Sequence, residues 1–414
     1  MSKKLLILSS IFIFSCSVNS NETFSNETIL AQNSKNNSVS YVQDEFIIKL
    51  NKGIKPEEYA KTNNLKLVSN IGLDMYVFKG NSDLELLKRD NKVKWVEKNK
   101  IINLPKLKSE PFIDNIKNHK RGVTNDPYLD IQYGISITGT DKAWSVQKGN
   151  PKVVVAIIDS GIDATHPEFQ GQLVKGMDFT VKPPKEGGDY DKYGHGTHVA
   201  GVVAAKADNG IGISGVAPNC KLMPVKIFND WGQSTEGAST QAVIWAVDNG
   251  AKVINASWGS PLPGEAFHEA VKYALEKDVV FVAAVGNSGN NDPDTKPYPG
   301  ASEGVIGVSA TTDIDGWASF STYGDQVDLG APGKAILSTY PLALGNGYRI
   351  MEGTSMAAPL VSGAAALVRS QFPNFTQAQV KERLENTAKD TVMTGKDQYV
   401  GFGRVDVAKA IISQ

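Results

Sequence analysis

The sequence has few of the residues that build disulfide frameworks or metal centres. Its 414 residues include two cysteines and five histidines, which excludes a disulfide scaffold and a cysteine-rich zinc module. It also lacks a net charge of either sign, because 43 Lys and Arg stand against 44 Asp and Glu. A nucleic-acid binder needs a basic face that neutralises phosphates, so we expect no nucleic-acid partner. With 41% hydrophobic residues, the composition is that of a globular protein.

The amino terminus lacks an apolar run long enough to span a bilayer, which needs about 20 residues. The run from Leu5 to Phe14 follows two lysines and has the length of a signal peptide, which we assign to residues 1–16. The run ends in Ile13-Phe14-Ser15-Cys16 and resembles the lipobox of bacterial lipoproteins. The resemblance implies that Cys16 is lipidated and anchors the protein to the membrane. Ordinary secretion is the alternative, and both place the protein in the cell envelope or outside the cell.

Residues 17–39 are rich in Asn, Ser, Thr and Glu. This composition buries too little apolar surface to order itself, so we expect a flexible tether.

The near-neutral total hides a charge asymmetry. Residues 1–121 carry 20 Lys and Arg against 13 Asp and Glu, a net charge of +7, and residues 122–414 carry 23 against 31, a net charge of −8. Complementary fields favour encounter. We therefore expect a basic segment that docks on an acidic domain of the same chain. Scatter in surface charge is the alternative.

Residues 40–105 have the pattern of a small α+β domain. We expect strands over 41–50, 65–71, 75–78 and 93–96, with helices beginning at Pro56 and at the capping-box pattern Ser82-Asp83-Leu84-Glu85. The order β-α-β-β-α-β is that of a ferredoxin-like fold, which by itself says nothing of function. Residues 106–124 are polar and basic, and we expect a protease-sensitive linker there.

From residue 125 to residue 414 the pattern changes to that of a larger domain. Continuous apolar runs at 153–158, 222–228, 253–256 and 279–285 indicate buried parallel strands. Helical stretches at 237–249 and 264–277 lie between them. This alternation predicts an α/β domain with a central parallel sheet that is covered by helices on both faces.

Three motifs stand at the ends of such elements. The first is Asp159-Ser160-Gly161-Ile162-Asp163, directly after an apolar strand. The second is Gly194-His195-Gly196-Thr197-His198-Val199-Ala200-Gly201, and the third is Gly353-Thr354-Ser355-Met356-Ala357-Ala358-Pro359; each opens a helix rich in small residues. The carboxyl ends of parallel strands are where α/β proteins form their sites. Ser355 would stand at a helix amino terminus, where backbone amides stabilise an anion.

An acid, a histidine and a serine are sufficient for acyl transfer. Histidine removes the proton of the serine hydroxyl, and the carboxylate orients the imidazole and stabilises its cation. Taken singly, each motif is weak evidence for a catalytic site, since turns, structural histidines and Gly-Thr-Ser sequences are common. The His195 and His198 pair also has a spacing found in metal sites, although the sequence offers no third ligand.

Together, and in the order Asp, His, Ser, the motifs resemble those of the subtilisin-like serine proteases. The resemblance covers residues 125–412 and is greatest to the thermitase-like branch, through Asn125-Asp126-Pro127-Tyr128 and Ser319-Phe320-Ser321-Thr322-Tyr323-Gly324. It implies a three-layer α/β catalytic domain and a serine endopeptidase that hydrolyses polypeptides through an acyl-enzyme.

The resemblance assigns a role to each motif. Asp159 matches the acid, His195 the general base and Ser355 the nucleophile, which leaves His198 as a helix-packing residue. Asn287, in Ala283-Ala284-Val285-Gly286-Asn287-Ser288-Gly289, matches the side-chain donor of the oxyanion hole. The backbone amide of Ser355 would be its partner.

The resemblance also implies where substrate lies. The two edges that pair with substrate are matched by Gly232-Gln233-Ser234 and Ser257-Trp258-Gly259. The pocket for the side chain before the scissile bond (P1) is bordered by Gly259, Ala284 and Gly286. None of these is charged, which favours an apolar P1 residue. Pro297 stands near the position of a smaller pocket-floor residue in relatives and bears on the depth of the pocket.

Members of this family often bind calcium near the start of the catalytic domain. The matching side-chain ligands are Asp126, Glu168 and Asn209, and the matching carbonyl ligands are Ala207, Ile211 and Ile213. Calcium takes six to eight oxygen ligands, partly from carbonyls. A pair of surface acids without a metal is the alternative. A second, thermitase-like site is not expected, because Val181 and Pro183 stand where acids would be needed.

By resemblance, residues 40–105 are the inhibitory prodomain of such proteases, which assists folding, fills the active-site cleft with its carboxy-terminal tail and is removed by its own enzyme. We expect the cut between residues 105 and 124. The whole chain is then an exported serine endopeptidase made as a zymogen, with its prodomain as intramolecular inhibitor. We expect a monomer.

Two other functions compete with this interpretation. A catalytically inactive, subtilisin-like binding protein would lack a triad or oxyanion residue, and none is missing. A serine esterase of the α/β-hydrolase type needs Gly-x-Ser-x-Gly, whereas Ser355 is followed by Met356-Ala357.

Overall fold

The computed structural model describes residues 39–106, 108–113, 123–262, 264–290 and 297–413. The predicted signal peptide, Cys16 and the central part of the linker lie outside these residues. The described residues belong to one unit. None of their helices has the length and apolarity needed to cross a membrane.

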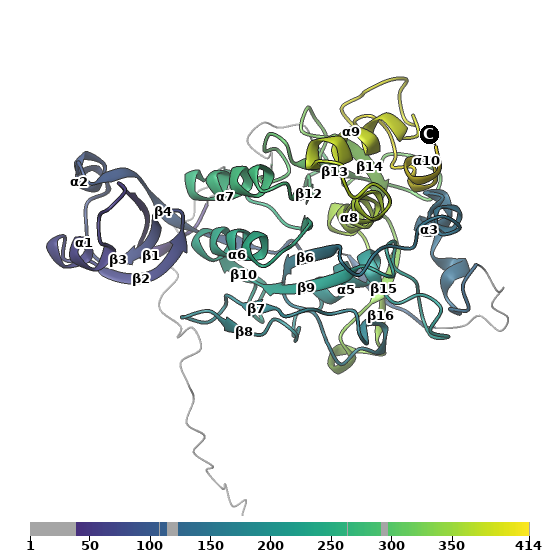
Figure 1. The fold of residues 1–414 in the computed structure, drawn as a ribbon, viewed down its shortest axis with the longest axis horizontal. Helices are drawn as coiled ribbons and strands as arrows, with labels where there is room; N and C mark the ends of the chain where they lie inside the picture. Colours follow the sequence, from purple (N-terminus) through teal and green to yellow (C-terminus); the bar gives the residue numbers. More distant parts are fainter. Residues whose placement is uncertain (1–38, 107, 114–122, 263, 291–296, 414) are drawn as a thin grey trace, which may run out of the picture. The chain divides into compact units, whose positions relative to one another are not determined.

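The small domain has the predicted order of elements (Figure 1). They are β1 (Tyr41–Leu50), α1 (Pro56–Thr62), β2 (Lys66–Gly72), β3 (Met75–Lys79), α2 (Leu84–Arg89) and β4 (Val93–Asn103). The strands form an antiparallel sheet in the order β4-β1-β3-β2, so the predicted fold is confirmed. Ile48, Phe78 and Tyr59 fill the core between this sheet and its two helices.

Two details of the small domain differ from expectation. Helix α2 is capped by Asp83, whose side chain accepts a hydrogen bond from the Glu85 amide, so the predicted capping box of Ser82 is not formed. Strand β4 continues to Asn103 instead of ending near Val96. Its residues 97–100 still pair with β1, and residues 101–103 pair with a strand of the large domain.

The large domain is built on an eight-stranded sheet in the order β14-β13-β12-β11-β6-β9-β7-β8. Its strands are β6 (Val154–Asp159), β7 (Met177–Asp178), β8 (Lys185–Glu186), β9 (Lys221–Lys226), β11 (Val253–Ala256), β12 (Val280–Ala284), β13 (Ile306–Thr311) and β14 (Leu329–Pro332). All neighbouring strands are parallel except β7 and β8. The predicted central parallel sheet is confirmed.

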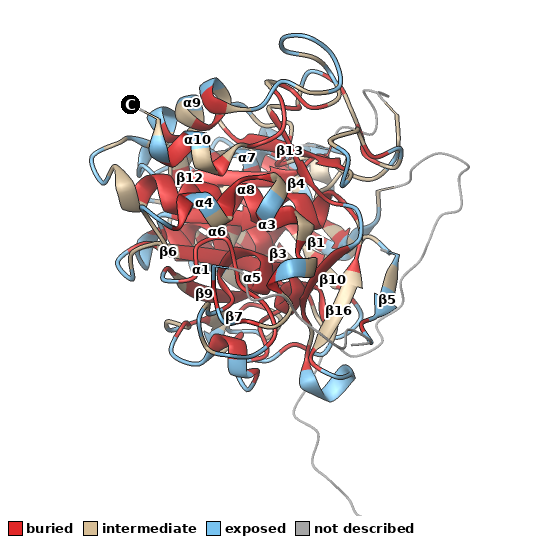
Figure 2. Ribbon diagram, turned by 90° about the vertical axis from the view of Figure 1, so that its right-hand side faces the viewer, coloured by how far each residue is buried: buried red, intermediate tan, exposed pale blue. Residues whose placement is uncertain are grey.

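Helices cover both faces of this sheet, as predicted. Helices α5 (His195–Ala204) and α8 (Thr354–Gln371) pack with Val155 and Ile157 on one face. Helices α6 (Glu236–Asp248) and α7 (Glu265–Glu276) pack with Ala156 and Ile158 on the other. Alternate residues of β6 thus serve opposite faces, and its continuous apolar run is explained by burial on both sides. Figure 2 shows the sheet and these helices as the buried centre.

The remaining elements lie around this centre. A three-stranded antiparallel sheet has the order β15-β16-β5, formed by β15 (Ile336–Thr339), β16 (Tyr348–Met351) and β5 (Ser109–Pro111). The short strand β10 (Gln233–Thr235) precedes α6 and joins the sheet of the small domain. The other helices are α3 (Tyr133–Ile137), α4 (Thr140–Ala143), α9 (Gln377–Thr387) and α10 (Val407–Ile412), with 3₁₀ turns at Leu129–Ile131, Pro167–Phe169 and Leu342–Leu344.

Candidate active site

The predicted acid and base meet at the carboxyl end of β6. Asp159 is the last residue of β6, and His195 is the first residue of α5. His195 Nδ1 lies 2.8 Å from Oδ1 and 3.0 Å from Oδ2 of Asp159, and both side chains are buried. A carboxylate can only accept a hydrogen bond, so Nδ1 carries a proton, and in the neutral imidazole Nε2 is the nitrogen with the free lone pair.

Two glycines let helix α5 begin against the turn that follows Asp159. Gly194 has φ of +98°, a left-handed conformation that glycine adopts without strain. A Cβ at Gly196 would lie 2.2 Å from the carbonyl oxygen of Gly161. The glycines on both sides of His195 are therefore needed to bring the imidazole to the carboxylate.

Ser355 is the second residue of α8, as predicted, and is buried. Its Oγ donates a hydrogen bond to the carbonyl oxygen of Ser257 at 2.8 Å. Within the described residues, His195 Nε2 has no hydrogen-bond partner. A hydrogen bond between Ser355 and His195 would thus require the hydroxyl to turn away from Ser257. Such bonds often form only when substrate is present.

Asn287 follows strand β12 and is tied to the residue before Ser355. Its Oδ1 accepts hydrogen bonds from the backbone amide of Thr354 at 2.8 Å and from its hydroxyl at 3.1 Å. With Oδ1 engaged, the Nδ2 group is the donor that Asn287 can present to a ligand. Sequence reasoning did not single out Thr354 for this contact, although it lies inside the Gly353-Thr354-Ser355 motif.

The second histidine of the motif has a structural environment. His198 Nε2 lies 3.1 Å from the carbonyl oxygens of Ile336 and Arg349. Burial lowers the pKa of His198 to about 3, so its imidazole is neutral at physiological pH. Its ring nitrogen is occupied by backbone, which agrees with the packing role expected of it and leaves His195 as the available base.

The two predicted substrate edges flank the same site. Trp258 is buried and donates from Nε1 to the Ile158 carbonyl oxygen at 2.7 Å, which fixes the segment 257–259 on the end of β6. A methyl group added at Gly259 would lie 2.7 Å from Pro297, and one added at Gly286 would lie 3.1 Å from Pro297. Pro297 therefore lies against both glycines, and Ala284 is buried beside them at the end of β12.

The edge 232–234 is occupied by the protein's own chain. Strand β4 pairs antiparallel with β10, with Ile102 opposite Ser234 and Asn103 opposite Gln233. The pairing continues through the Leu104 amide, which donates to the Gly232 carbonyl oxygen at 2.8 Å. The last residues of the small domain thus form a strand on the edge that the resemblance assigns to substrate.

A second segment of the chain lies on the strand that leads to Ser355. Strand β5 pairs antiparallel with β16, with Ser109 opposite Met351. The Glu352 amide donates to the Lys108 carbonyl oxygen at 3.1 Å, and the Phe112 side chain is buried beyond the strand. Sequence reasoning assigned residues 106–124 to a linker and missed this strand, because a three-residue strand that ends in proline carries no periodic signal.

The small domain also caps two helices of the large domain. Glu97 accepts hydrogen bonds from the amides of Glu265 at 3.0 Å and Ala266 at 2.9 Å, at the start of α7. Asn99 accepts one from the Gly237 amide at 3.0 Å, at the start of α6. A helix amino terminus leaves four amides unpaired, and side-chain oxygens satisfy them. Capping is normally sought next to the helix in sequence, so these distant partners were not predicted.

The structure brings the predicted calcium ligands together around the loop 207–213. The Asp126 carboxylate accepts hydrogen bonds from the amides of Asp208 and Asn209 and from the Ser214 hydroxyl. Glu168 accepts hydrogen bonds from the Ile213 amide and from Asn209 Nδ2, both at 2.8 Å. Asp126 and Glu168 are both buried.

Several backbone carbonyl oxygens of this loop have no hydrogen-bond donor in the described part of the chain. Within the described residues, the carbonyl oxygens of Ala207, Ile211 and Ile213 accept no hydrogen bond. Burial raises the pKa of Glu168 to about 7, and the nearby Asp126 carboxylate adds to this effect, whereas hydrogen bonds from Ile213, Asn209 and Tyr348 oppose it. The donor set, two buried carboxylates, one amide side chain and three carbonyls, is all oxygen and fits a calcium ion, provided that the Asn209 side chain presents its oxygen.

Comparison with known proteins agrees with this geometry. The sequence model of the Subtilase family matches residues 150–403. The chain is 36% identical to the thermophilic serine proteinase of Bacillus sp. (strain AK1), over 99% of this chain and 98% of the relative. It is 38% identical to thermitase of Thermoactinomyces vulgaris, over 69% of this chain and 98% of the relative.

Among solved structures, the fold is similar to that of fervidolysin from Fervidobacterium pennivorans, a keratinolytic enzyme related to subtilisin, with a TM-score of 0.78 and 31% identity. The match covers 90% of this chain and 61% of fervidolysin. The family expected from the three motifs is thereby confirmed. The chain belongs to the subtilase family and is a serine endopeptidase.

Proposed function

We propose that Asp159, His195 and Ser355 form the catalytic triad of this endopeptidase. The observation that carries the assignment is the buried pair of His195 Nδ1 and Asp159, which leaves Nε2 of His195 without a partner among the described residues, beside the helix that carries Ser355. A nucleophile needs a base whose own orientation is held by a third group, and these residues supply both.

The reaction follows from these three groups. Ser355 Oγ forms a bond to the substrate carbonyl carbon while Nε2 of His195 takes the hydroxyl proton, and Asp159 stabilises the imidazolium. The C–N bond then breaks, and the proton passes from Nε2 to the leaving amine. Water, activated by the same base, hydrolyses the ester and restores Ser355.

The oxyanion of the tetrahedral intermediate needs donors in fixed positions. Asn287 Nδ2 is one candidate, because Oδ1 is held by Thr354. The Ser355 backbone amide is the other, because it lies in the first turn of α8, where amides have no partner within the helix.

The pocket for the P1 side chain is proposed to take apolar residues. Gly259, Ala284 and Gly286 border it and carry no charge, and Pro297 packs against the two glycines. A charged side chain entering such a pocket would lose its hydration without a partner.

The chain is proposed to be a zymogen. Residues 101–104 lie on the strand edge assigned to substrate, and residues 108–111 lie on the strand before Ser355. Glu97 and Asn99 hold the small domain on the starts of α7 and α6. Substrate cannot pair with an edge that is already paired, so removal of residues 40–105 is expected to precede activity.

Calcium is proposed as a structural cofactor held by Asp126, Glu168, Asn209 and the carbonyls of the loop 207–213. When bound, the ion would supply the positive charge that the buried carboxylates lack. It takes no part in the reaction.

Export is proposed from the signal peptide at residues 1–16. If Cys16 is lipidated, the anchor belongs to the part that precedes the catalytic domain, so maturation would release the enzyme from the membrane. Cell fractionation with sequencing of the mature amino terminus tests this. A membrane-bound active form that begins at residue 16 would contradict it.

A serine-directed fluorophosphonate tests the nucleophile. The wild-type enzyme is expected to react, and Ser355→Ala is expected not to react. The exposed Ser145 provides a matched control, since Ser145→Ala makes the same chemical change away from the site. Equal labelling of wild type and Ser355→Ala would refute the assignment, and no labelling of either would favour an inactive binding protein.

A further inference from the structure

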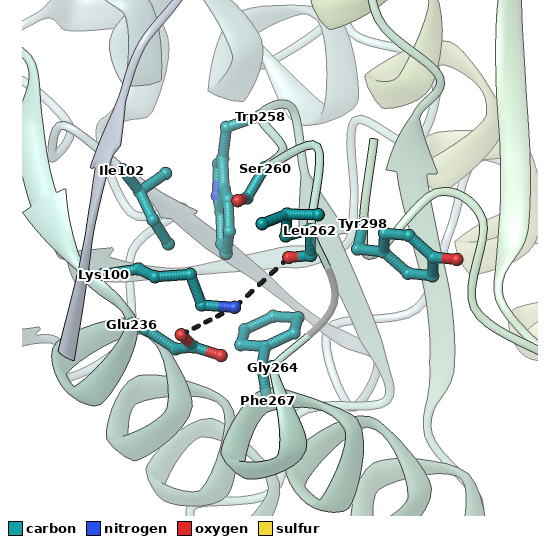
Figure 3. Close-up of a pocket in the computed structure, with 9 residues that line it drawn as sticks. All are labelled: Lys100, Ile102, Glu236, Trp258, Ser260, Leu262, Gly264, Phe267 and Tyr298. Atoms are coloured by element: carbon teal, nitrogen blue, oxygen red, sulfur yellow. Dashed lines mark hydrogen bonds and ion pairs between the residues drawn. The ribbon is translucent and has the colours of Figure 1, made fainter. Parts of the chain in front are cut away.

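A pocket lies beside strand β4, next to the segment 257–259 (Figure 3). Its apolar lining comes from Trp258, Leu262, Phe267 and Tyr298 of the large domain. Ile102 of the small domain enters it and is 5% exposed. Because Ile102 stands opposite Ser234 on the substrate edge, it occupies the place of a substrate side chain.

An acid lies at one end of this apolar pocket. Glu236 is the first residue of α6, and its side chain is only 3% exposed. A Cβ at Gly264 would lie 1.2 Å from Oε1 of Glu236, so only glycine leaves room for the carboxylate. An almost fully buried carboxylate is costly unless a cation pairs with it.

The cation that pairs with Glu236 belongs to the small domain. Lys100 Nζ lies 3.0 Å from Oε2 of Glu236 and also donates to the Leu262 carbonyl oxygen at 3.3 Å. Figure 3 shows the lysine reaching across the pocket to both groups. Within the described residues, the side-chain carboxylate of Glu236 has no other ion-pair or hydrogen-bond partner.

Lys100 and Ile102 reach one pocket because they belong to one strand. Side chains two residues apart in a strand point to the same face. A peptide that replaces β4 on β10 would therefore present its own pair of side chains, two residues apart, to Glu236 and to the apolar lining.

We infer that Glu236 is a specificity-determining residue, which selects substrates that carry lysine or arginine two residues before the apolar side chain that fills the pocket. The inference rests on the proposed function, since Lys100 must leave with the small domain before a substrate can take its place. Within the zymogen, Lys100 forms the ion pair with Glu236 that a basic substrate side chain would form in the mature enzyme.

The charges around Glu236 change when the small domain leaves. Burial and the neighbouring Glu97 raise the pKa of Glu236 to about 8, while Lys100 lowers it. Removal of the small domain takes away both Glu97 and Lys100. The apolar lining residues Trp258, Leu262 and Phe267 carry no charge that would compete for an arriving cation.

Two peptides test the inference on the matured enzyme. One copies Asn99 to Leu104 and continues with phenylalanine and a chromogenic anilide; its twin has glutamine in place of lysine. We expect the wild type to prefer the lysine peptide about tenfold in kcat/KM, the size expected for one partly desolvated charge pair. In Glu236→Gln the ratio of the two peptides should fall to about one.

Glu265→Gln is the matched control, because this acid is exposed at the start of the neighbouring helix α7. It should keep the tenfold preference, and labelling by the fluorophosphonate gives the concentration of active sites in each variant. A wild-type ratio near one, or an unchanged ratio in Glu236→Gln, would overturn the inference.

Amino-terminal sequencing separates this inference from the proposed maturation. An enzyme that has lost residues 40–105 and cuts both peptides equally contradicts the specificity alone. An active chain that keeps residues 40–105 contradicts the maturation and, with it, this inference.

Discussion

At the residue scale, His195 and His198 stand three positions apart at the start of α5 and have different partners. His195 pairs with a carboxylate and keeps one nitrogen free, whereas His198 is held by two backbone carbonyls. The residues alone did not distinguish them, because the partners of both lie far away in sequence. Resemblance to the subtilases was needed to choose His195.

The low pKa of His198 predicts acid sensitivity. The folded protein binds this proton only below about pH 3, whereas the unfolded chain binds it below about 6.5. The stability contribution is therefore present above pH 6.5 and is lost as the pH falls towards 3. In a Ser355→Ala background, His198→Gln should make the free energy of unfolding fall less steeply over this range, by up to about 1.4 kcal/mol per pH unit.

Urea unfolding at a series of pH values measures this slope. His268→Gln, at an exposed position, should keep the slope of the parent protein. If the free energy of unfolding falls equally steeply with pH in His198→Gln and in the parent protein, His198 does not contribute to the acid sensitivity.

Asn287 makes a second prediction at this scale. Asn287→Ala removes the proposed oxyanion donor, and kcat should fall about 100- to 1000-fold, the loss known for a side-chain oxyanion donor of subtilisin itself, with KM little changed. Steady-state kinetics on a chromogenic peptide measure both constants. A loss confined to KM would assign Asn287 to substrate binding instead.

At the scale of elements, the four adjacent strands β12, β11, β6 and β9 could be predicted from sequence because each is a continuous apolar run. The strands on either side of them, β13 and β14 and the short β7 and β8, were not predicted. The predicted run 153–158 and the observed Val154–Asp159 differ by one residue. The predicted hairpin and helices of the small domain were found for the same reason, since their periodicity is local.

What could not be predicted are the elements that exist only through distant partners. The second half of β4, strand β10 and strand β5 are each defined by pairing with residues far away in sequence. The capping of α6 and α7 by Asn99 and Glu97 is of the same kind. Sequence patterns indicate burial and local conformation, and neither of these identifies a pairing or capping partner that is distant in sequence.

Strand β5 makes a prediction for maturation. Phe112 is 7% exposed and packs with Ile213 and Leu337, and its carbonyl oxygen accepts a hydrogen bond from Asn346 Nδ2. After a cut near residue 105, this anchor should keep residues 108–112 on β16 and delay access to the site. Phe112→Ala should shorten the lag between chain cleavage and casein hydrolysis several-fold, because it removes most of the buried area.

Gel analysis in parallel with a casein assay measures that lag. The neighbouring Ile113 is 69% exposed, and Ile113→Ala should leave the lag unchanged. Equal lags in Phe112→Ala and the wild type would show that β5 does not delay activity.

At the scale of the whole molecule, the charge asymmetry has a structural counterpart. Lys49 and Lys100 of the small domain form ion pairs with Glu269 and Glu236 of the large domain. In a further ion pair the charges are reversed, because Lys182 belongs to the large domain and lies 3.3 Å from Glu45 of the small domain. The near-neutral total is thus divided between a basic amino-terminal part and an acidic enzyme that meet through paired charges.

Calcium removal tests the proposed cofactor at this scale. In a Ser355→Ala background, which prevents self-digestion, a calcium chelator should lower Tm by about 5–10 °C, because an ion bound only to the folded state stabilises it by mass action. Glu168→Gln should abolish most of this response. Asp208→Asn, on the same loop but with a side chain that is 48% exposed, should retain it. An equal Tm with and without chelator would exclude a structural calcium.

The central claim is that Ser355 both matures the chain and hydrolyses substrate. The most direct measurement follows the mass of purified wild type and Ser355→Ala during incubation and assays casein hydrolysis at each time. The account predicts that the wild type loses its residues up to a cut between 105 and 124 and gains activity, while Ser355→Ala keeps its full length and stays inactive. Self-processing of Ser355→Ala at the wild-type rate would contradict the account.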